Sequence, residues 1–141
     1  QQRADSLRVL AGTTGVRGPG IKMRIDGQDA FFASDLLNTV QELRDAGAEA
    51  IEVNGNRVVV DTWFADSGDG VSISGTVVGG PYEITAIGGP STMATAMRIP
   101  GGIADTVESQ DGSIVITELD RVEILSTVNL PEADPNVSVT D

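Results

Sequence analysis

The sequence predicts an α+β fold: a ferredoxin-like plait in which two β-α-β units share one antiparallel sheet, with a hairpin inserted between the units. In the first unit, residues 21–53, an alternating apolar pattern, a helical pattern and a short apolar run follow one another. Residues 82–125 repeat that order. A chain of 141 residues that is 40% hydrophobic can close one core but not two. We therefore expect one domain over residues 15–130.

The first unit carries the clearest local signals. Apolar and polar residues alternate over 21–26, which is typical of a strand with one buried face. Residues 34–46 predict an amphipathic helix with Ser34 as its N-cap and Gly47 in a left-handed conformation after its last turn. The apolar run over 48–53 then predicts the second strand.

The remaining elements follow from turn signals and apolar runs. Asn54-Gly55 predicts a tight turn that sends strand 48–53 back into a strand over 57–62, and a second turn at 66–70 leads into 71–73. The second unit is expected as strand 82–87, helix 90–98 and strands 113–117 and 122–125. The residues expected in the core are Leu36, Val40, Leu43, Ile51, Val53, Ile84, Ile87 and Met97.

The ends of the chain are expected to lie outside the domain. Apolar residues at 4, 7 and 10 suit the last turns of a helix that begins further upstream, so residues 1–14 are interpreted as a helix end and a linker. The glycines of residues 12–20 predict an irregular loop. Residues 131–141 contain two prolines and three acids without periodicity, and they predict a loose tail.

Charge limits the classes of partner. The net charge is −12, and the nine cationic residues are spread along the chain, so binding to a nucleic acid backbone is not expected. The same charge opposes docking on anionic lipid. No apolar run approaches the ~18 residues that span a bilayer, so any membrane attachment is expected through a segment outside this sequence.

The central motifs resemble a known family. Residues 43–57 read LRDAGAEAIEVNGNR, with GPG before them at 18–20 and PYEITAIG after them at 81–88. This order is similar to bacterial domain-of-unknown-function family 881, the YlxX/YlxW-like proteins. The resemblance implies a plait-like domain outside the cytoplasmic membrane, joined by a helical segment to one N-terminal transmembrane helix, with a link to cell division. It implies no established activity.

The sequence offers little for catalysis. It contains neither histidine nor cysteine, so the common general base and the thiol nucleophile are both missing. A carboxylate-based hydrolase could draw on Glu49, Glu52, Asp61 or Asp66, although stacking aromatics are scarce. The turn at residues 66–70 lacks the third acid and the distal glutamate of a calcium loop. We therefore expect no enzyme activity, no cofactor and no metal.

Two groups of residues are candidates for binding. Adjacent residues of a strand point to opposite faces, so either Trp63 or Phe64 should lie outside the core and could anchor a partner. Glu49, Asn54 and Arg57 could form a polar patch, or more simply a cross-strand ion pair beside a turn.

Three functions remain open, in order of preference. The first is an extracytoplasmic interaction or scaffold domain with protein partners in the cell envelope, which could dimerise through its N-terminal helix. The second is a sensor of a small ligand or a cell-wall fragment. The third is the carboxylate-based hydrolase. An exposed edge strand would favour the first function and a pocket with converging polar groups would favour the second.

Overall fold

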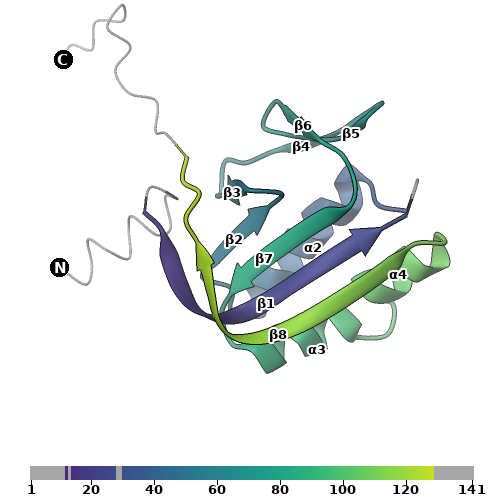
Figure 1. The fold of residues 1–141 in the computed structure, drawn as a ribbon. Coiled ribbons are helices and arrows are strands. Elements are labelled where there is room, and N and C mark those ends of the chain that lie inside the picture. Colours follow the sequence, from purple (N-terminus) through teal and green to yellow (C-terminus); the bar gives the residue numbers. More distant parts are fainter. Residues whose placement is uncertain (1–11, 13, 28–29, 129–141) are drawn as a thin grey trace, which may run out of the picture.

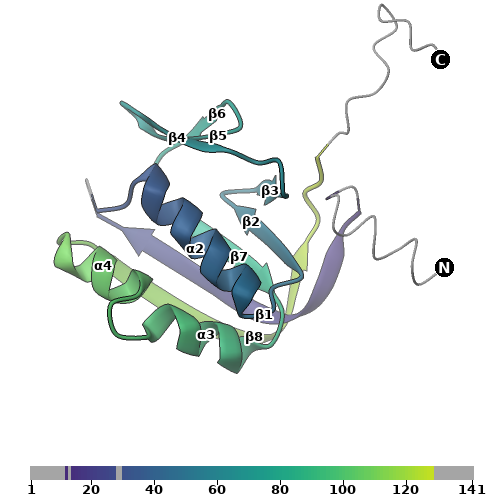
Figure 2. The same ribbon diagram turned by 180° about the vertical axis from the view of Figure 1, so that it is seen from behind.

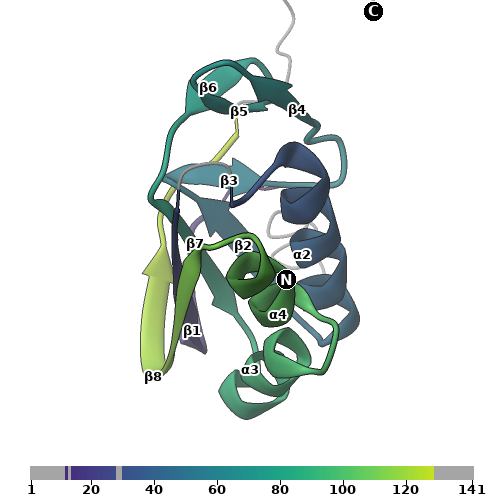
Figure 3. The same cartoon turned by 90° about the vertical axis from the view of Figure 1, so that its right-hand side faces the viewer.

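A computed structural model of the chain describes residues 12, 14–27 and 30–128. A five-stranded sheet carries three helices on one face, and a separate three-stranded sheet lies beyond one end of helix α2 (Figures 1, 2 and 3). No helix within these described residues is long and apolar enough to cross a membrane. The helix end predicted over 1–10 and the tail predicted over 131–141 lie outside the described residues.

The elements follow in chain order. They are β1 (Val16–Asp26), α2 (Ala33–Asp45), β2 (Ala50–Val53), β3 (Asn56–Val58), β4 (Phe64–Ser67), β5 (Gly70–Ile73), β6 (Thr76–Val78), β7 (Tyr82–Ile87), α3 (Pro90–Arg98), α4 (Ile103–Ser109) and β8 (Ser113–Ile124).

The large sheet has the order β3-β2-β7-β1-β8, and every neighbouring pair is antiparallel. Met23 of β1 lies between Ile84 of β7 and Ile116 of β8, so the apolar side chains of the three strands form one row. The predicted antiparallel sheet and both predicted helices are confirmed, and the chain has an α+β fold.

The core lies between the sheet and the helices. All the residues predicted for it are buried, and Leu36, Leu43 and Met97 have no exposed surface. Ile87 belongs to a second, smaller cluster with Ala50, Val122 and Ile124, whereas its neighbour Ala86 packs in the main cluster. Alternation along β7 explains this, because residues 86 and 87 point to opposite faces of the sheet.

The loop predicted over residues 12–20 is wrong for most of its length, because β1 begins at Val16. Strand β8 is long enough to pair with it, and Val16 lies opposite Ile124. An irregularity between Gly18 and Gly20 accommodates Pro19, which has no N–H to donate to the sheet. A Cβ on Gly20 would lie 2.1 Å from the carbonyl oxygen of Ala86, so the glycine allows β1 to approach β7 closely.

The predictions for the C-terminal half also need correction. Strands 113–117 and 122–125 are one continuous strand, β8, because Glu118 and Leu119 between them still pair with Ile21 and Gly20 of β1. Helix α4 was not expected, because a seven-residue helix with only Ile103 and Val107 buried gives little periodic signal.

The inserted segment is larger than the predicted hairpin. The strand expected over 57–62 ends at Val58, because the Val59 amide donates to Thr62 Oγ1 at 2.8 Å and turns the chain. Strands β4, β5 and β6 then form an antiparallel sheet of their own. The turn at Ser74-Gly75, where both residues have positive φ, joins β5 to β6 and was not recognised in the sequence.

We predict that Leu43→Ala lowers the free energy of unfolding by about 2 to 4 kcal/mol, because it leaves a cavity under helix α2. Leu37 lies on the same helix and is 44% exposed, so Leu37→Ala is the matched control and should cost about 1 kcal/mol or less. Chemical denaturation of the three proteins measures the difference. Equal midpoints for the two variants would mean that the buried face of α2 is misassigned.

Candidate binding cleft

A cleft of about 630 Å³ lies between the end of the large sheet and the small sheet. Its walls come from the end of β1, the start of α2, the turn between β4 and β5, and the start of β7. The residues that line it are Asp26, Gly27, Phe31, Phe32, Asp66, Ser67, Gly68, Asp69, Gly70, Gly80, Pro81 and Tyr82. This volume is in the range of small-ligand sites.

The start of helix α2 forms one wall and is capped by two carboxylates. Ser34 was predicted as the N-cap, but the helix begins at Ala33 and its N-cap is Phe32. Asp35 Oδ2 accepts a hydrogen bond from the Phe32 amide at 3.0 Å, and Asp66 Oδ1 accepts one from the Ala33 amide at 2.7 Å. Asp66 belongs to β4, so a side chain of the small sheet completes the helix N-terminus.

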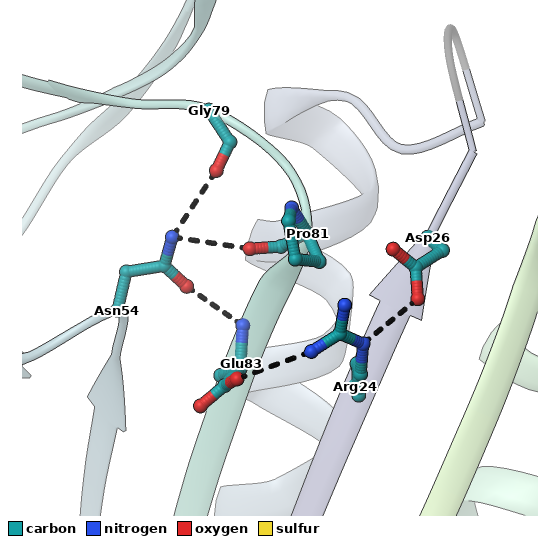
Figure 4. A network of polar contacts seen from close by, with 6 residues as sticks. All are labelled: Arg24, Asp26, Asn54, Gly79, Pro81 and Glu83. Carbon is teal, nitrogen blue, oxygen red and sulfur yellow. Dashed lines mark hydrogen bonds and ion pairs between the residues drawn. The ribbon is translucent and has the colours of Figure 1, made fainter.

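The start of β7 is fixed by Asn54 (Figure 4). Its Nδ2 donates to the carbonyl oxygens of Gly79 at 3.2 Å and Pro81 at 3.4 Å, and its Oδ1 accepts from the Glu83 amide at 2.7 Å. Asn54 itself has φ 48° and Gly55 has φ 82°, which confirms the predicted turn. Asn54 therefore positions the backbone that closes the cleft.

Asp26 is held by a neighbouring cation. Arg24 Nε donates to Asp26 Oδ2 at 2.9 Å, and Arg24 Nη1 lies 3.6 Å from Glu83 Oε2 (Figure 4). All three side chains are well exposed, so these pairs orient Asp26 more than they stabilise the fold.

Tyr82 is the most buried polar side chain of the cleft wall. It is 6% exposed, and its ring lies 5.2 Å from the ring of Phe31 with a tilt of 47°. No described residue forms a hydrogen bond with its hydroxyl. Burial raises the pKa of Tyr82 above its ordinary value, and the carboxylate of Asp66 raises it further.

Arg57 lies elsewhere and has a structural role. Its side chain is 3% exposed, and Nη1 donates to the carbonyl oxygens of Thr14 at 2.8 Å and Ser126 at 2.9 Å. Burial lowers the pKa of Arg57, and the carboxylate of Glu52 opposes that shift. Arg57 thereby joins the chain before β1 to the chain after β8.

The predicted group of Glu49, Asn54 and Arg57 is not brought together as one site. In the register about the Asn54-Gly55 turn, Arg57 lies opposite Glu52, and Glu49 lies beyond the paired residues. Glu49 and Arg57 line one groove of about 390 Å³, while Asn54 lies at the far end of β2. A binding role for these three residues stays a prediction.

Trp63 lies directly before β4, and Phe64 is the first residue of that strand. Trp63 is 53% exposed, whereas Phe64 packs against the main core. The Trp63 backbone is held by Ser74, whose amide donates to the Trp63 carbonyl oxygen at 2.8 Å and whose Oγ accepts from the Trp63 amide at 3.1 Å. A partner-binding role for this pair stays a prediction.

The sequence interpretation did not identify this cleft. Of the acids proposed for hydrolysis only Asp66 lines it, and it joins Asp26 and Asp69. Within the described part of the chain, no three acids are placed to hold a metal ion. The available signal was the aromatic residues themselves, because three of the five in the chain, Phe31, Phe32 and Tyr82, gather at the cleft.

Comparison with known proteins identifies a family. A family model described as "Bacterial protein of unknown function (DUF881)" matches residues 3–135. The chain is 40% identical over 129 residues to UPF0749 protein Rv1825 of Mycobacterium tuberculosis, a match that covers 88% of this chain and 44% of that protein. It is 27% identical over 123 residues to UPF0749 protein YlxW of Bacillus subtilis, covering 78% of this chain and 52% of that protein.

The fold is also found in a solved structure. The crystal structure of an uncharacterized conserved protein from Mycobacterium tuberculosis superposes with a TM-score of 0.85 at 34% identity, covering 98% of this chain and 99% of that one. The chain spans about half the length of these two curated relatives.

We predict that the titration of Tyr82, the sole tyrosine, has its midpoint above the ordinary value of 10.0 in the folded protein and at that value in denaturant. Because the folded state holds the proton more tightly, the stability that this group contributes is complete below pH ~10 and is lost as the pH rises through the raised pKa. Absorbance of the phenolate measures both midpoints.

Tyr82→Phe supplies the control, since it lacks the group and should lose less stability than the wild type above pH ~10. Identical folded and unfolded midpoints would show that the ring is not in the buried environment described.

Proposed function

The chain belongs to the bacterial DUF881 family, and on that premise we propose that this domain works by binding a protein partner and not by catalysis. One observation carries the proposal. Trp63 is 53% exposed directly before β4, which is an edge strand of the small sheet, although the adjacent Phe64 is used by the core. A large exposed aromatic beside an edge strand is suited to anchoring a partner.

The chemistry of the chain supports contact over catalysis. The whole sequence lacks histidine and cysteine. Asp66, the one proposed catalytic acid that reaches the cleft, already accepts a hydrogen bond from the Ala33 amide. A carboxylate that caps a helix is constrained in geometry and is poorly placed to move as a general acid or base.

For the location we propose that the domain stands outside the cytoplasmic membrane, held by an upstream helical segment and a transmembrane helix, and serves envelope assembly or cell division. The family resemblance supports this. The described ends of the chain also suit an anchor: the Val128 amide donates to the Gly12 carbonyl oxygen at 2.8 Å, near the Val16 end of β1. The cleft lies at the Asp26 end, roughly 30 Å along the strand.

We further infer that the large sheet is a ferredoxin-like plait. Without the added strand β3, its order is β2-β7-β1-β8, and each of the two crossovers, β1-α2-β2 and β7-α3-α4-β8, skips over one antiparallel strand. That is the arrangement of a split β-α-β pair.

A second candidate function is sensing of a small ligand or a cell-wall fragment. The cleft favours it, because about 630 Å³ with aromatic walls and several polar groups is a typical binding cavity.

The proposed dimerisation through the N-terminal helix concerns residues outside the described part of the chain.

We predict that Trp63→Ala in the full-length protein reduces recovery of a cross-linked envelope partner by about tenfold, while the melting temperature stays within ~2 °C of the wild type. Phe64→Ala should lower the melting temperature, because its side chain packs against the core. Val77→Ala is the matched control, since Val77 is 49% exposed on the opposite edge strand, β6. Cross-linking in cells, followed by membrane fractionation and pull-down, gives the measurement.

Two results would contradict the proposal. One is a full-length protein that fractionates as a cytosolic monomer. The other is unchanged partner recovery in Trp63→Ala together with a hydrolytic activity that a carboxylate substitution abolishes.

A further inference from the structure

The described side chains around the cleft carry negative charge. Asp26, Asp66 and Asp69 contribute carboxylates, and among the described residues that line the cleft none is Lys or Arg. Arg24 neutralises part of this charge through Asp26 from outside the wall. The chain as a whole carries −12, so the potential at this end remains negative.

An anionic ligand is the first alternative, because a helix N-terminus attracts anions. Here the amides of Phe32 and Ala33 already bind the carboxylates of Asp35 and Asp66, at 3.0 and 2.7 Å. An incoming anion would have to displace these groups and would also meet the charge of Asp69. The cleft therefore disfavours anions.

A metal ion is the second alternative. Calcium takes about six to eight oxygen ligands and magnesium six, partly from water, and a site built by the protein alone needs several carboxylates that converge on one point. Within the described residues, no group of three acids is close enough to do this. The carboxylates are instead spread around a cavity far larger than an ion.

The hydroxyl of Tyr82 points to a different kind of ligand. The side chain is more than nine-tenths buried, yet no described residue forms a hydrogen bond with this hydroxyl. Among the described residues, every fully buried polar side-chain atom has a hydrogen-bond partner. The Tyr82 oxygen has none, so it must keep some accessible surface. Tyr82 lines this cleft, so we take that surface to face the cleft. An unpartnered phenol is able to accept a hydrogen bond from a ligand.

We propose that the cleft binds a primary alkylammonium group. Its ammonium would take Asp69 as counter-ion and Tyr82 as hydrogen-bond acceptor, and its apolar stem would pack on the exposed ring of Phe32, whose face also attracts cations. This inference rests on the second candidate function, ligand sensing, and does not require the Trp63 contact.

The test is an NMR titration of the 141-residue chain with three probes: pentylamine, Nα-acetyl-lysine methylamide and Nα-acetyl-norleucine methylamide. The two ammonium probes should give saturable shifts at the amides of residues 27 and 68–70, and the uncharged norleucine derivative should not. If the lysine derivative binds more tightly, the natural ligand is a lysine side chain of a polypeptide. If pentylamine binds more tightly, the natural ligand is a free amine. Either supports the proposal.

Three substitutions distinguish binding in the cleft from general attraction of a cation to the acidic protein. Asp69→Asn should weaken ammonium binding by about fivefold or more, and Tyr82→Phe by about threefold or more. Asp120→Asn is the matched control, because Asp120 is exposed towards the other end of β8 and its substitution changes the net charge equally. That variant should bind within about twofold of the wild type.

The proposal is overturned by equal shifts with the norleucine derivative, by equal weakening in Asp69→Asn and Asp120→Asn, or by inorganic phosphate shifting the same amides in place of the amines. Trp63→Ala should leave the titration unchanged, so a failure of the ammonium site and a failure of partner binding are distinguishable.

Discussion

The hydrogen bond from the Ala33 amide to Asp66 Oδ1 is the contact on which the functional end of the molecule depends. A helix N-terminus carries unsatisfied amides, and a carboxylate that accepts from one of them is favoured both by the hydrogen bond and by the helix dipole. Here the carboxylate comes from an inserted sheet 33 residues further along the chain. A local requirement of helix α2 therefore fixes the position of a separate structural unit. Phe64, Val71 and Ile73 of the same unit pack against the main core and reinforce the docking.

The two ends of the large sheet differ in structure: one holds the described ends of the chain together, and the other encloses the cleft. At the Val16 end, buried Arg57 holds the backbone before β1 and after β8 together, while Ser126 Oγ donates to Glu52. At the Asp26 end, the insert, the start of α2 and the start of β7 enclose the cleft. The apolar sheet and helices between them supply rigidity. This division keeps the described ends of the chain, Gly12 and Val128, away from the candidate cleft.

The elements that local patterns determine were predicted from the sequence. Helix α2, strand β7 and the Asn54-Gly55 turn each combine periodic apolar residues with a characteristic turn or cap residue. The parts that were missed depend on contacts distant in sequence. Ser34 is a good local N-cap, but Asp66 and Asp35 take that role, and nothing near residue 34 signals a partner in β4. Residues 16–20 are glycine-rich and become a strand only because β8 is long enough to pair with them. The cleft unites residues from four elements, so no spacing along the chain reveals it. The sequence did predict that one of Trp63 and Phe64 would lie outside the core.

Amide hydrogen exchange tests most directly whether Asp66 docks the insert. In the wild type, the Ala33 amide and the amides of Val71 and Ile73 should be protected. In Asp66→Ala, protection of Ala33 and of β4 to β6 should fall by about tenfold or more, while Met23 and Ile84 in the large sheet keep theirs. Asp69→Ala, in the same turn region but without a bond to α2, should leave all these amides unchanged. Undiminished protection of β5 in Asp66→Ala, or an equal loss throughout both sheets, would contradict the account.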